Sequence, residues 1–510
     1  METNQKGIFN KILVYVEKGG NALPHPATLF ALFALFTLIL SLVAYHLDWS
    51  AMMPAIGDAL PQEVHPINLL SREGIHNLMK DMVVNFTSFA PLGIVLVAML
   101  GIGVAEHSGL ISAVIRQLVL SAPKKSITFV LVLAGILSNV ASDVGYVLLI
   151  PLAGIIFQSI GRHPVVGMAA AFAGVSGGFS ANLILGTVDP LLAGLSTEAA
   201  QIVDSTYEVN PTANYYFMVV STFLIAFSGT WVTEKIIAPR LGEYKGDAEK
   251  VNIDKLSKIE KKGLRNTAIV AVLIFAGIIW GVVPENGFFR GMDGSLLGSP
   301  LIKGVIAVLF IVASILGLVY GFTTKEYKND SDVMKGMSKS IKTLSLYIVL
   351  VFFAAQFVAY FKMSNLGIIF AIKGANLIQS TGLGLIPLSI MFVILAATIN
   401  MIMGSASAKW AIMAPIFIPM FMLLGYSPEL TQVVYRIGDS VSNIISPMMS
   451  FFALIIAFIQ KYDKKAGIGT IIATMLPYSV VFFIVWTILL VAWIYLGLPL
   501  GPGSGIYYAS

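Results

Sequence analysis

Apolar runs without a charged residue recur along the whole of this 510-residue chain. Examples are 27–45, 213–233 and 266–284, each close to the roughly 20 residues that a helix needs to cross the hydrocarbon core of a bilayer. Charged residues make up 12% of the chain, against about 25% in a soluble domain. This pattern predicts an all-α polytopic membrane protein.

The apolar runs divide into long segments and shorter pieces. We expect spans over 27–45, 87–105, 126–138, 165–188, 213–233, 266–284, 301–322, 343–361, 384–402, 431–459 and 469–497, with short or interrupted pieces near 109–121, 144–160, 366–379 and 410–424. No stretch has the composition of a separate soluble domain, so residues 1–510 are expected to form one integral membrane domain.

Lysine and arginine are distributed unevenly between the apolar runs. Nine of them lie in 234–265, which we interpret as a charged helical linker, whereas 189–211 has none. The positive-inside rule assigns 1–25, 106–125, 234–265, 325–342 and 461–465 to the cytoplasm and 46–80, 189–211, 285–300 and the C-terminus to the outside. A cytoplasmic N-terminus and an external C-terminus in the plasma (inner) membrane require an odd number of crossings.

Two stretches of the chain share a pattern of aromatic, proline, glycine, serine and asparagine residues. In order these are Tyr146, Pro151, Gly161, Pro164, Ser180 and Asn182 in the first, and Trp410, Pro415, Gly425, Pro428, Ser440 and Asn443 in the second. The loops that follow the two stretches lie on opposite expected sides of the membrane. We therefore expect an inverted repeat, roughly 126–190 and 384–459, like those that form midplane sites in secondary transporters. The alternative is a chance likeness between two pairs of apolar helices.

Polar segments interrupt the apolar runs in both repeats. "SNVASD" covers 138–143 and "GSASAK" covers 404–409, and Ser, Asn and Gly favour helix caps and turns. Irregular backbone at membrane depth is tolerated only where protein or a water-filled cavity satisfies its polar groups. We interpret the segments as the tips of two re-entrant hairpins, whose exposed N–H groups attract an anion.

Several motifs resemble the AbgT family of p-aminobenzoyl-glutamate transporters over essentially the whole chain. They are "PHP" (24–26), "NFTSFAPLG" (85–93), "GRHPVVGMAAAFAGVSGGFSANL" (161–183), "STEAA" (196–200), "APIFIPMFMLLGYSP" (414–428) and "GLPLGPG" (497–503). The resemblance implies a homodimer whose subunits each have nine transmembrane helices and two re-entrant hairpins. It also implies cation-coupled movement of p-aminobenzoyl-glutamate and, in some members, export of sulfonamide antimetabolites.

The resemblance also assigns functional positions. These are Asp189 in "GTVDP", Asn400 in "ATINMI", Ser407 and Trp410 of the second hairpin, Pro428 at its far end, and the pair Arg436 and Asp439. Lys409, beside Trp410, departs from what a substrate-lining tip needs, and we expect it to snorkel to an aqueous edge.

The charged stretch "YRIGDSVSNIISP" (435–447) is the most informative candidate site. We expect an unwound half-helix in which Arg436 neutralises Asp439 or receives a substrate carboxylate, while Asp439 binds the coupling ion or carries a proton. Ionisable groups at membrane depth usually mark a pathway, although a structural ion pair between two helices is the alternative.

The other candidates have simpler alternatives. Asp189 would otherwise be a solvated loop residue, and Trp410, expected to stack on an aromatic substrate, would otherwise be a core residue. Asn182 and Asn443, matched in the repeat, are candidate cation or substrate ligands. Asp143, at the first hairpin tip, is a candidate second coupling carboxylate.

A secondary transporter is the function that this pattern favours. An intramembrane enzyme would need a paired catalytic motif, and a channel would not need two matched hairpins. No P-loop, G-x-S-x-G elbow or metal-ligand spacing is present in the sequence, so we expect no ATP drive, no enzymatic activity, no metal and no cofactor other than a coupling Na⁺ or H⁺. The net charge of +5 resides mainly in loops, which argues against nucleic-acid binding.

The predicted topology can be tested by cysteine labelling, because the chain has no native cysteine. A cysteine at Ser205 should react with an impermeant maleimide in intact cells, and one at Lys250 should react only after permeabilisation. Labelling of the Lys250 variant from outside would overturn the inverted repeat.

Overall fold

The computed structural model describes residues 24–54, 61–140, 144–244, 255–296 and 298–508. Within these residues, nine helical segments are long and apolar enough to cross a membrane. They are α2 (Pro26–His46), α3–α4 (Arg72–Thr87 and Ala90–His107), α10–η3–α11 (Tyr215–Val232, Thr233–Ile237 and Ala238–Leu241), α12 (Lys258–Val282), α14 (Val305–Thr324), α16 (Ser345–Met363), α18 (Leu385–Ile402), α19 (Ala406–Leu423) and α22 (Ile468–Tyr495). The expected all-α membrane architecture is confirmed.

Shorter elements fill the spaces between these segments. They are β1 (Ala51–Met53), β2 (Gln62–Val64), α5 (Leu110–Leu120), α6 (Ile127–Ser138), η1 (Gly145–Leu149), α7 (Ile150–Ser159), α8 (Pro164–Phe172), η2 (Ala173–Gly177), α9 (Val188–Ala200), α13 (Pro300–Lys303), α15 (Asp330–Thr343), α17 (Leu366–Ser380), α20 (Pro428–Asn443) and α21 (Phe452–Gln460). The two strands pair antiparallel, with Ala51 opposite Val64.

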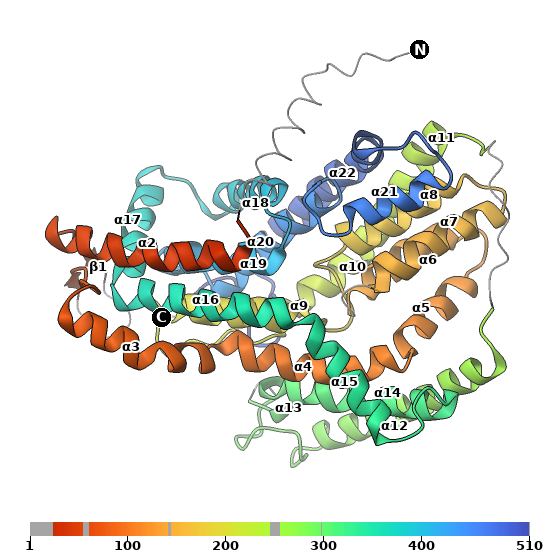
Figure 1. Ribbon diagram of the computed structural model, residues 1–510, viewed down its shortest axis with the longest axis horizontal. Coiled ribbons are helices and arrows are strands. Elements are labelled where there is room, and N and C mark those ends of the chain that lie inside the picture. The colour runs from red at the N-terminus through yellow and green to blue at the C-terminus, as the bar shows by residue number, and fades with distance from the viewer. Residues whose placement is uncertain (1–23, 55–60, 141–143, 245–254, 297, 509–510) are drawn as a thin grey trace.

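The helices form three groups around a buried centre (Figure 1). Helices α2, α3 and α16 lie together, α14 packs against α4 at one edge with α12 packed on α14, and α6, α7 and α8 lie on the other side with α10 and α22. Helix α20 lies in the middle, where it contacts α9, α18, α19, α22 and η2. All 16 of its residues are buried, so every polar side chain on it must find a partner inside the protein.

Several expected boundaries need correction. The span expected over 165–188 ends with η2 at Gly177, and the span expected over 126–138 is the 12-residue helix α6, which is shorter than a membrane crossing requires. The span expected over 431–459 is two helices, α20 and α21, and the half-helix expected to be unwound around Arg436 is regular, since the irregular backbone begins only after Asn443. The piece near 410–424 is an 18-residue helix despite two internal prolines. Part of the expected linker belongs to α12, which begins at Lys258 behind a capping box of Ser257 and Glu260. The rest of the linker includes 245–254, outside the described residues.

The two sequence repeats have the same order of local structures. Helices α6, α7, α8–η2 and α9 correspond to α18, α19, α20 and α21. The G-x-x-P motifs form equivalent turns: Gly161 and Gly425 have φ of 78° and 86°, and Pro164 and Pro428 each follow a cap residue as the first residue of a helix. Positive φ favours glycine, and proline suits a first helical turn.

Each repeat also brings a hairpin tip against a break in a helix. A Cβ on Gly186, in the break between η2 and α9, would meet the backbone of Asn139 at the end of α6. In the same way, a Cβ on Gly404, between α18 and α19, would meet the backbone of Met448 in the break between α20 and α21. Glycine is therefore required for the close backbone approach at both places. The opposite membrane orientation of the repeats stays a prediction, as does the re-entrant course of the hairpins.

Close packing of α20 on α18 gives a test of this arrangement. A Cβ on Gly438 would overlap the carbonyl oxygen of Val393 and the side chain of Ala396. Gly438→Ala should therefore lower the stability of the purified protein by about 1–3 kcal/mol through overpacking, seen as a lower melting temperature in detergent. Gly93→Ala is the matched control, since nothing lies within 4 Å of that Cβ. Equal melting temperatures for both variants would contradict the packing.

Candidate functional site

Two buried ion pairs hold the central helix to its neighbours. Arg436 Nη2 lies 2.7 Å from Asp189 Oδ1, and Lys409 Nζ lies 2.5 Å from Asp439 Oδ1. The side chains of all four residues are at most 5% exposed. The charges of Arg436 and Asp439 are therefore paired inside the protein, as ionisable groups at membrane depth require.

The expected pairing of Arg436 with Asp439 is wrong. Both residues lie on α20, but Arg436 turns towards α9, which carries Asp189, and Asp439 turns towards α19, which carries Lys409. The expected snorkelling of Lys409 is also wrong, because the lysine is fully buried. Partners from adjacent helices satisfy these charges better than a residue one turn away on the same helix.

Asp189 is a buried acceptor at the start of α9. Its Oδ2 accepts a hydrogen bond of 2.7 Å from the backbone N–H of Gly186, while Oδ1 faces Arg436. The side chain thus joins the break after η2 to α20, and it is not a solvated loop residue. Arg436 Nε is buried and has no hydrogen-bond partner, so the guanidinium has unused donor capacity.

Asn400 organises the surroundings of the second ion pair. Its Nδ2 donates to the main-chain oxygen of Asp439, to Ser442 Oγ and to Asn443 Oδ1 at 3.1, 2.9 and 2.8 Å, and its Oδ1 accepts from Lys409 Nζ. Asn443 Nδ2 also donates to Asp439 Oδ2 at 3.3 Å. Asn400, Asp439 and Asn443 thus form one connected group of amides and a carboxylate.

Trp410 is fully buried, with its ring stacked on that of Tyr435 at a centroid distance of 4.4 Å. Its Nε1 donates to Ser196 Oγ, and Ser196 donates in turn to Gln432 Oε1. In this conformation the ring packs α19 against α9 and α20. Substrate stacking on Trp410 stays a prediction, and it would require Tyr435 to move away from one face of the ring.

The remaining candidates lie at helix ends. Pro428 begins α20, and its cap residue Ser427 accepts the backbone N–H of Leu430. Asn182 lies in the break after η2, where its Oδ1 accepts the backbone N–H groups of the next two residues. Ser440 Oγ accepts the N–H of Ser180 at 3.1 Å, which ties that break to α20. Asp143 lies outside the described residues.

A cavity of about 440 Å³ lies where the two repeats meet. Its lining comes from both hairpin tips, from the break after η2 and the start of α9, from the break between α20 and α21, and from the end of α15. The lining residues are Asn139, Tyr146, Phe179, Thr187, Val188, Thr343, Gly404, Ser405, Ala406, Ser407, Asn443, Met449, Ser450 and Phe451. Tyr146 and Phe451 stack at 4.4 Å with an interplanar angle of 11°. Ser407 and Asn443, both predicted from the sequence, lie on this wall.

Helix ends of opposite polarity meet at this site. The N-termini of α9 and α19 contribute Thr187, Val188 and the segment 405–407 to the cavity lining. Helix N-termini favour anions. Asn400 and Asn443 lie in the last turns of α18 and α20, whose C-terminal ends favour cations. The cavity therefore has an anion-attracting wall next to a cation-attracting group of oxygens.

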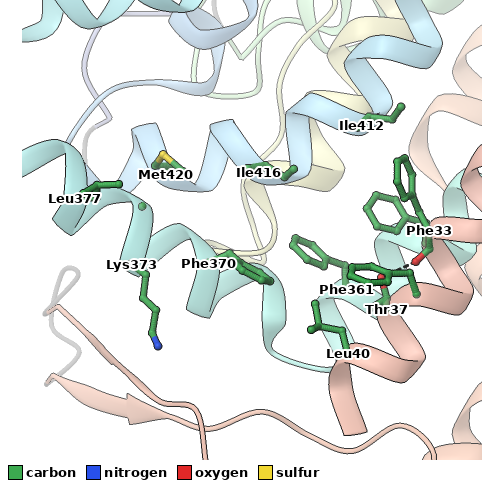
Figure 2. Close-up of a pocket in the computed structure, with 13 residues that line it drawn as sticks. Phe33, Thr37, Leu40, Phe361, Phe370, Lys373, Leu377, Ile412, Ile416 and Met420 are labelled. Carbon is green, nitrogen blue, oxygen red and sulfur yellow. Dashed lines mark hydrogen bonds between the residues drawn. The ribbon is translucent and has the colours of Figure 1, made fainter. Parts of the chain in front are cut away.

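A second cavity, of about 480 Å³, has different chemistry (Figure 2). It opens between α2, α16, α17 and α19, and its lining is mainly apolar, with Phe33, Phe361, Phe370 and Ile416 around it. Lys373 points away from these side chains, with Nζ 5.6 Å from the centroid of the Trp49 ring. Such a lining offers few partners for carboxylates, so the cavity between the repeats is the better candidate site.

Sequence reasoning missed several residues of the site. Lys409 was recognised as unusual but not as the partner of Asp439. Asn139 lies in the segment "SNVASD" that was expected to form a hairpin tip, but the residue itself was not a candidate. Thr187 and Phe451 were not candidates either, because they reach the cavity from separate segments. Tyr146 was noted only as part of the repeat, where its match to Trp410 was the available signal.

The described structure defines a polytopic helical membrane protein with paired charges and a polar cavity at its centre, as in transporters. Its sequence matches the profile of the AbgT transporter family over residues 11–508. It is 36% identical to the p-aminobenzoyl-glutamate transport protein of Escherichia coli (strain K12), over 97% of this chain and 96% of that protein. The chain therefore belongs to the AbgT family of transporters.

Solved structures agree with this assignment. The YdaH transporter of Alcanivorax borkumensis is 45% identical, with a TM-score of 0.89 over 94% of this chain and all of that one. MtrF of Neisseria gonorrhoeae, described with a class of antimetabolite efflux pumps, is 48% identical, with a TM-score of 0.91 over 97% of this chain and all of that one. The resemblance noted in the sequence is confirmed.

The ion pair between Arg436 and Asp189 predicts a specific pattern of rescue. Arg436→Gln alone should destabilise the protein strongly, since removing one partner of a buried pair typically costs about 3–5 kcal/mol. Adding Asp189→Asn should restore much of the melting temperature and membrane expression. Adding Asp439→Asn to Arg436→Gln should restore less, and a larger recovery in that second pair would contradict the pairing.

Proposed function

We propose that this chain is a secondary active transporter of p-aminobenzoyl-glutamate driven by a cation gradient. The observation that carries the proposal is the cavity between the repeats, which combines a stacked aromatic pair with two helix N-termini. The proposed substrate joins an aromatic ring to a glutamate with two carboxylates, so its two parts match the two kinds of lining. The name of the relative from Escherichia coli supports the same substrate.

The lining suggests how such a substrate would be oriented. Its ring would pack against Phe451 and Tyr146, since aromatic pairs favour offset or edge contacts. Its carboxylates would accept hydrogen bonds at the N-termini of α9 and α19, where Thr187, Ser405 and Ser407 add hydroxyl groups. Asn443 lines the cavity and donates a hydrogen bond to Asp439, so a substrate that contacts Asn443 would change the surroundings of the ion pair.

The coupling cation would bind beside Asp439. The oxygens of Asp439 and Asn400 lie together near the C-terminal ends of α18 and α20, and secondary transporters hold Na⁺ or H⁺ at such helix ends. Asp189 is a second buried carboxylate on the path between the repeats, but Arg436 neutralises it in this conformation.

Export of sulfonamide antimetabolites is the second candidate function. The similarity to MtrF favours it, and the aromatic lining of the cavity would accept a sulfonamide ring as readily as an aminobenzoyl group. Uptake and export can use the same binding site in an alternating-access transporter. With a given cation gradient, uptake requires substrate and cation to cross in the same direction, and export requires them to cross in opposite directions.

The arrangement in the membrane belongs to the same proposal. The protein would lie in the inner membrane as a homodimer, with its N-terminus in the cytoplasm and its C-terminus outside. Helix α12 is mostly exposed and carries large apolar side chains such as Leu273, Phe275 and Trp280, and little of α14 is fully buried. Lipid or a second copy of the chain would cover such a surface.

Transport by purified protein in liposomes tests the proposal. Radiolabelled p-aminobenzoyl-glutamate should accumulate against its concentration gradient when a Na⁺ or H⁺ gradient of the right direction is imposed, and collapse of the gradient should abolish accumulation. A labelled sulfonamide in the same liposomes separates the two functions. Passage that merely equilibrates would indicate a channel, and chemical conversion of the substrate would indicate an enzyme.

The same assay tests the cavity. Phe451→Ala should weaken the apparent substrate affinity roughly two- to tenfold, because aromatic contacts of this kind contribute about 0.5–1.5 kcal/mol beyond area burial. Phe36→Ala is the control, since Phe36 lines the second, apolar cavity and is largely exposed. A larger loss in the Phe36 variant would move the binding site to the apolar cavity.

A further inference from the structure

Lys409 occupies the position that a cation would take beside Asp439. Its ammonium contacts one carboxylate oxygen of Asp439 and the amide oxygen of Asn400, and the side chain is fully buried. Oxygens of carboxylate and amide groups are also the donors that hard metal cations prefer. A lysine ammonium and a bound monovalent cation would therefore have the same charge and contact the same oxygens.

The single carboxylate of Asp439 cannot neutralise both the ammonium of Lys409 and a second cation. Lys409 and Asp439 form a neutral pair in a water-excluded environment, and a further positive charge there would be unpaired. Unpaired buried charges are strongly unfavourable. A cation that binds Asp439 and Asn400 must therefore displace the ammonium of Lys409, which is tethered to α19 and stays near by.

The cavity is the nearest polar space for the displaced ammonium. Lys409 lies in the first helical turn of α19, two residues after the segment 405–407 that lines the cavity. Asn443 is both part of the cavity wall and a hydrogen-bond partner of Asp439 and Asn400, so it separates the ion pair from the cavity. In the cavity, the ammonium would stand beside the expected position of a substrate carboxylate.

We propose that Lys409 is a tethered competitor for the coupling-cation site and that its displacement couples cation binding to substrate binding. With no cation bound, Lys409 neutralises Asp439. When a monovalent metal cation takes the oxygens of Asp439 and Asn400, Lys409 is released and pairs with a carboxylate of the substrate. This inference rests on the proposed function and assigns it a coupling residue.

Two binding measurements on purified full-length protein test the inference. The first is the melting temperature as a function of Na⁺ at constant ionic strength, with choline as the replacement ion. The second is the affinity for p-aminobenzoyl-glutamate, measured calorimetrically with and without Na⁺. Neither measurement depends on transport activity.

Lys409→Gln should remove the competitor and leave Asp439 available. The variant should be less stable without Na⁺, and Na⁺ should restore its stability at concentrations between about 5- and 150-fold lower than those that affect the unmodified protein, the usual range of coupling between sites. Na⁺ should raise substrate affinity in the unmodified protein but not in this variant. The double variant Lys409→Gln with Asp439→Asn should fold without Na⁺ and lose the response to it.

Lys373→Gln is the matched control, because Lys373 is exposed and lies beside the apolar cavity. It should respond to Na⁺ as the unmodified protein does. An unchanged or weaker Na⁺ response in Lys409→Gln would overturn the inference, as would Na⁺-dependent substrate affinity in that variant. A protein that ignores Na⁺ altogether would also overturn it, while accumulation driven by an H⁺ gradient in liposomes would leave the proposed function standing.

Discussion

Charges buried at membrane depth must be paired, and the architecture around α20 follows from that constraint. The helix carries Arg436 and Asp439 and is buried on every side. Each charge takes its partner from a different helix, Asp189 on α9 and Lys409 on α19. Because a buried charge that loses its partner is strongly destabilising, these two contacts fix the position of α20 relative to both hairpin repeats.

The same ion pairs make the centre of the protein sensitive to the binding of charged ligands. A pair of charges in a water-excluded site is neutral only while both partners stay, so a ligand that takes one partner obliges the other to find a new one. Carboxylate-bearing substrates and cations are ligands of this kind. The cavity next to Asn443, with helix N-termini on one side and helix C-termini on the other, places both kinds of ligand close to the pairs.

The hairpin tips meet the helix breaks through glycine. Gly186 and Gly404 each lie against backbone of a neighbouring segment, where a side chain would prevent the approach. Irregular backbone inside a membrane protein needs protein or water around it, and here the tip of one segment and the break of another enclose the cavity together. The repeat in sequence thus produces two matched half-sites that are complete only when they meet.

The sequence by itself determined the membrane class, the family and most of the helix positions, because these depend on local apolar runs and motifs. The charged pair Arg436 and Asp439 stood out in an apolar segment, whereas Asp189, Asn400 and Ser407 became candidates only through the resemblance to the family. Only the tertiary structure decided which residues form the buried ion pairs. Arg436 and Asp439 are three residues apart, yet each selects a partner from a distant segment. The burial of Lys409 and the arrival of Phe451 in the cavity were decided in the same way, because electrostatic and packing partners are chosen by distance in space and not by separation along the chain.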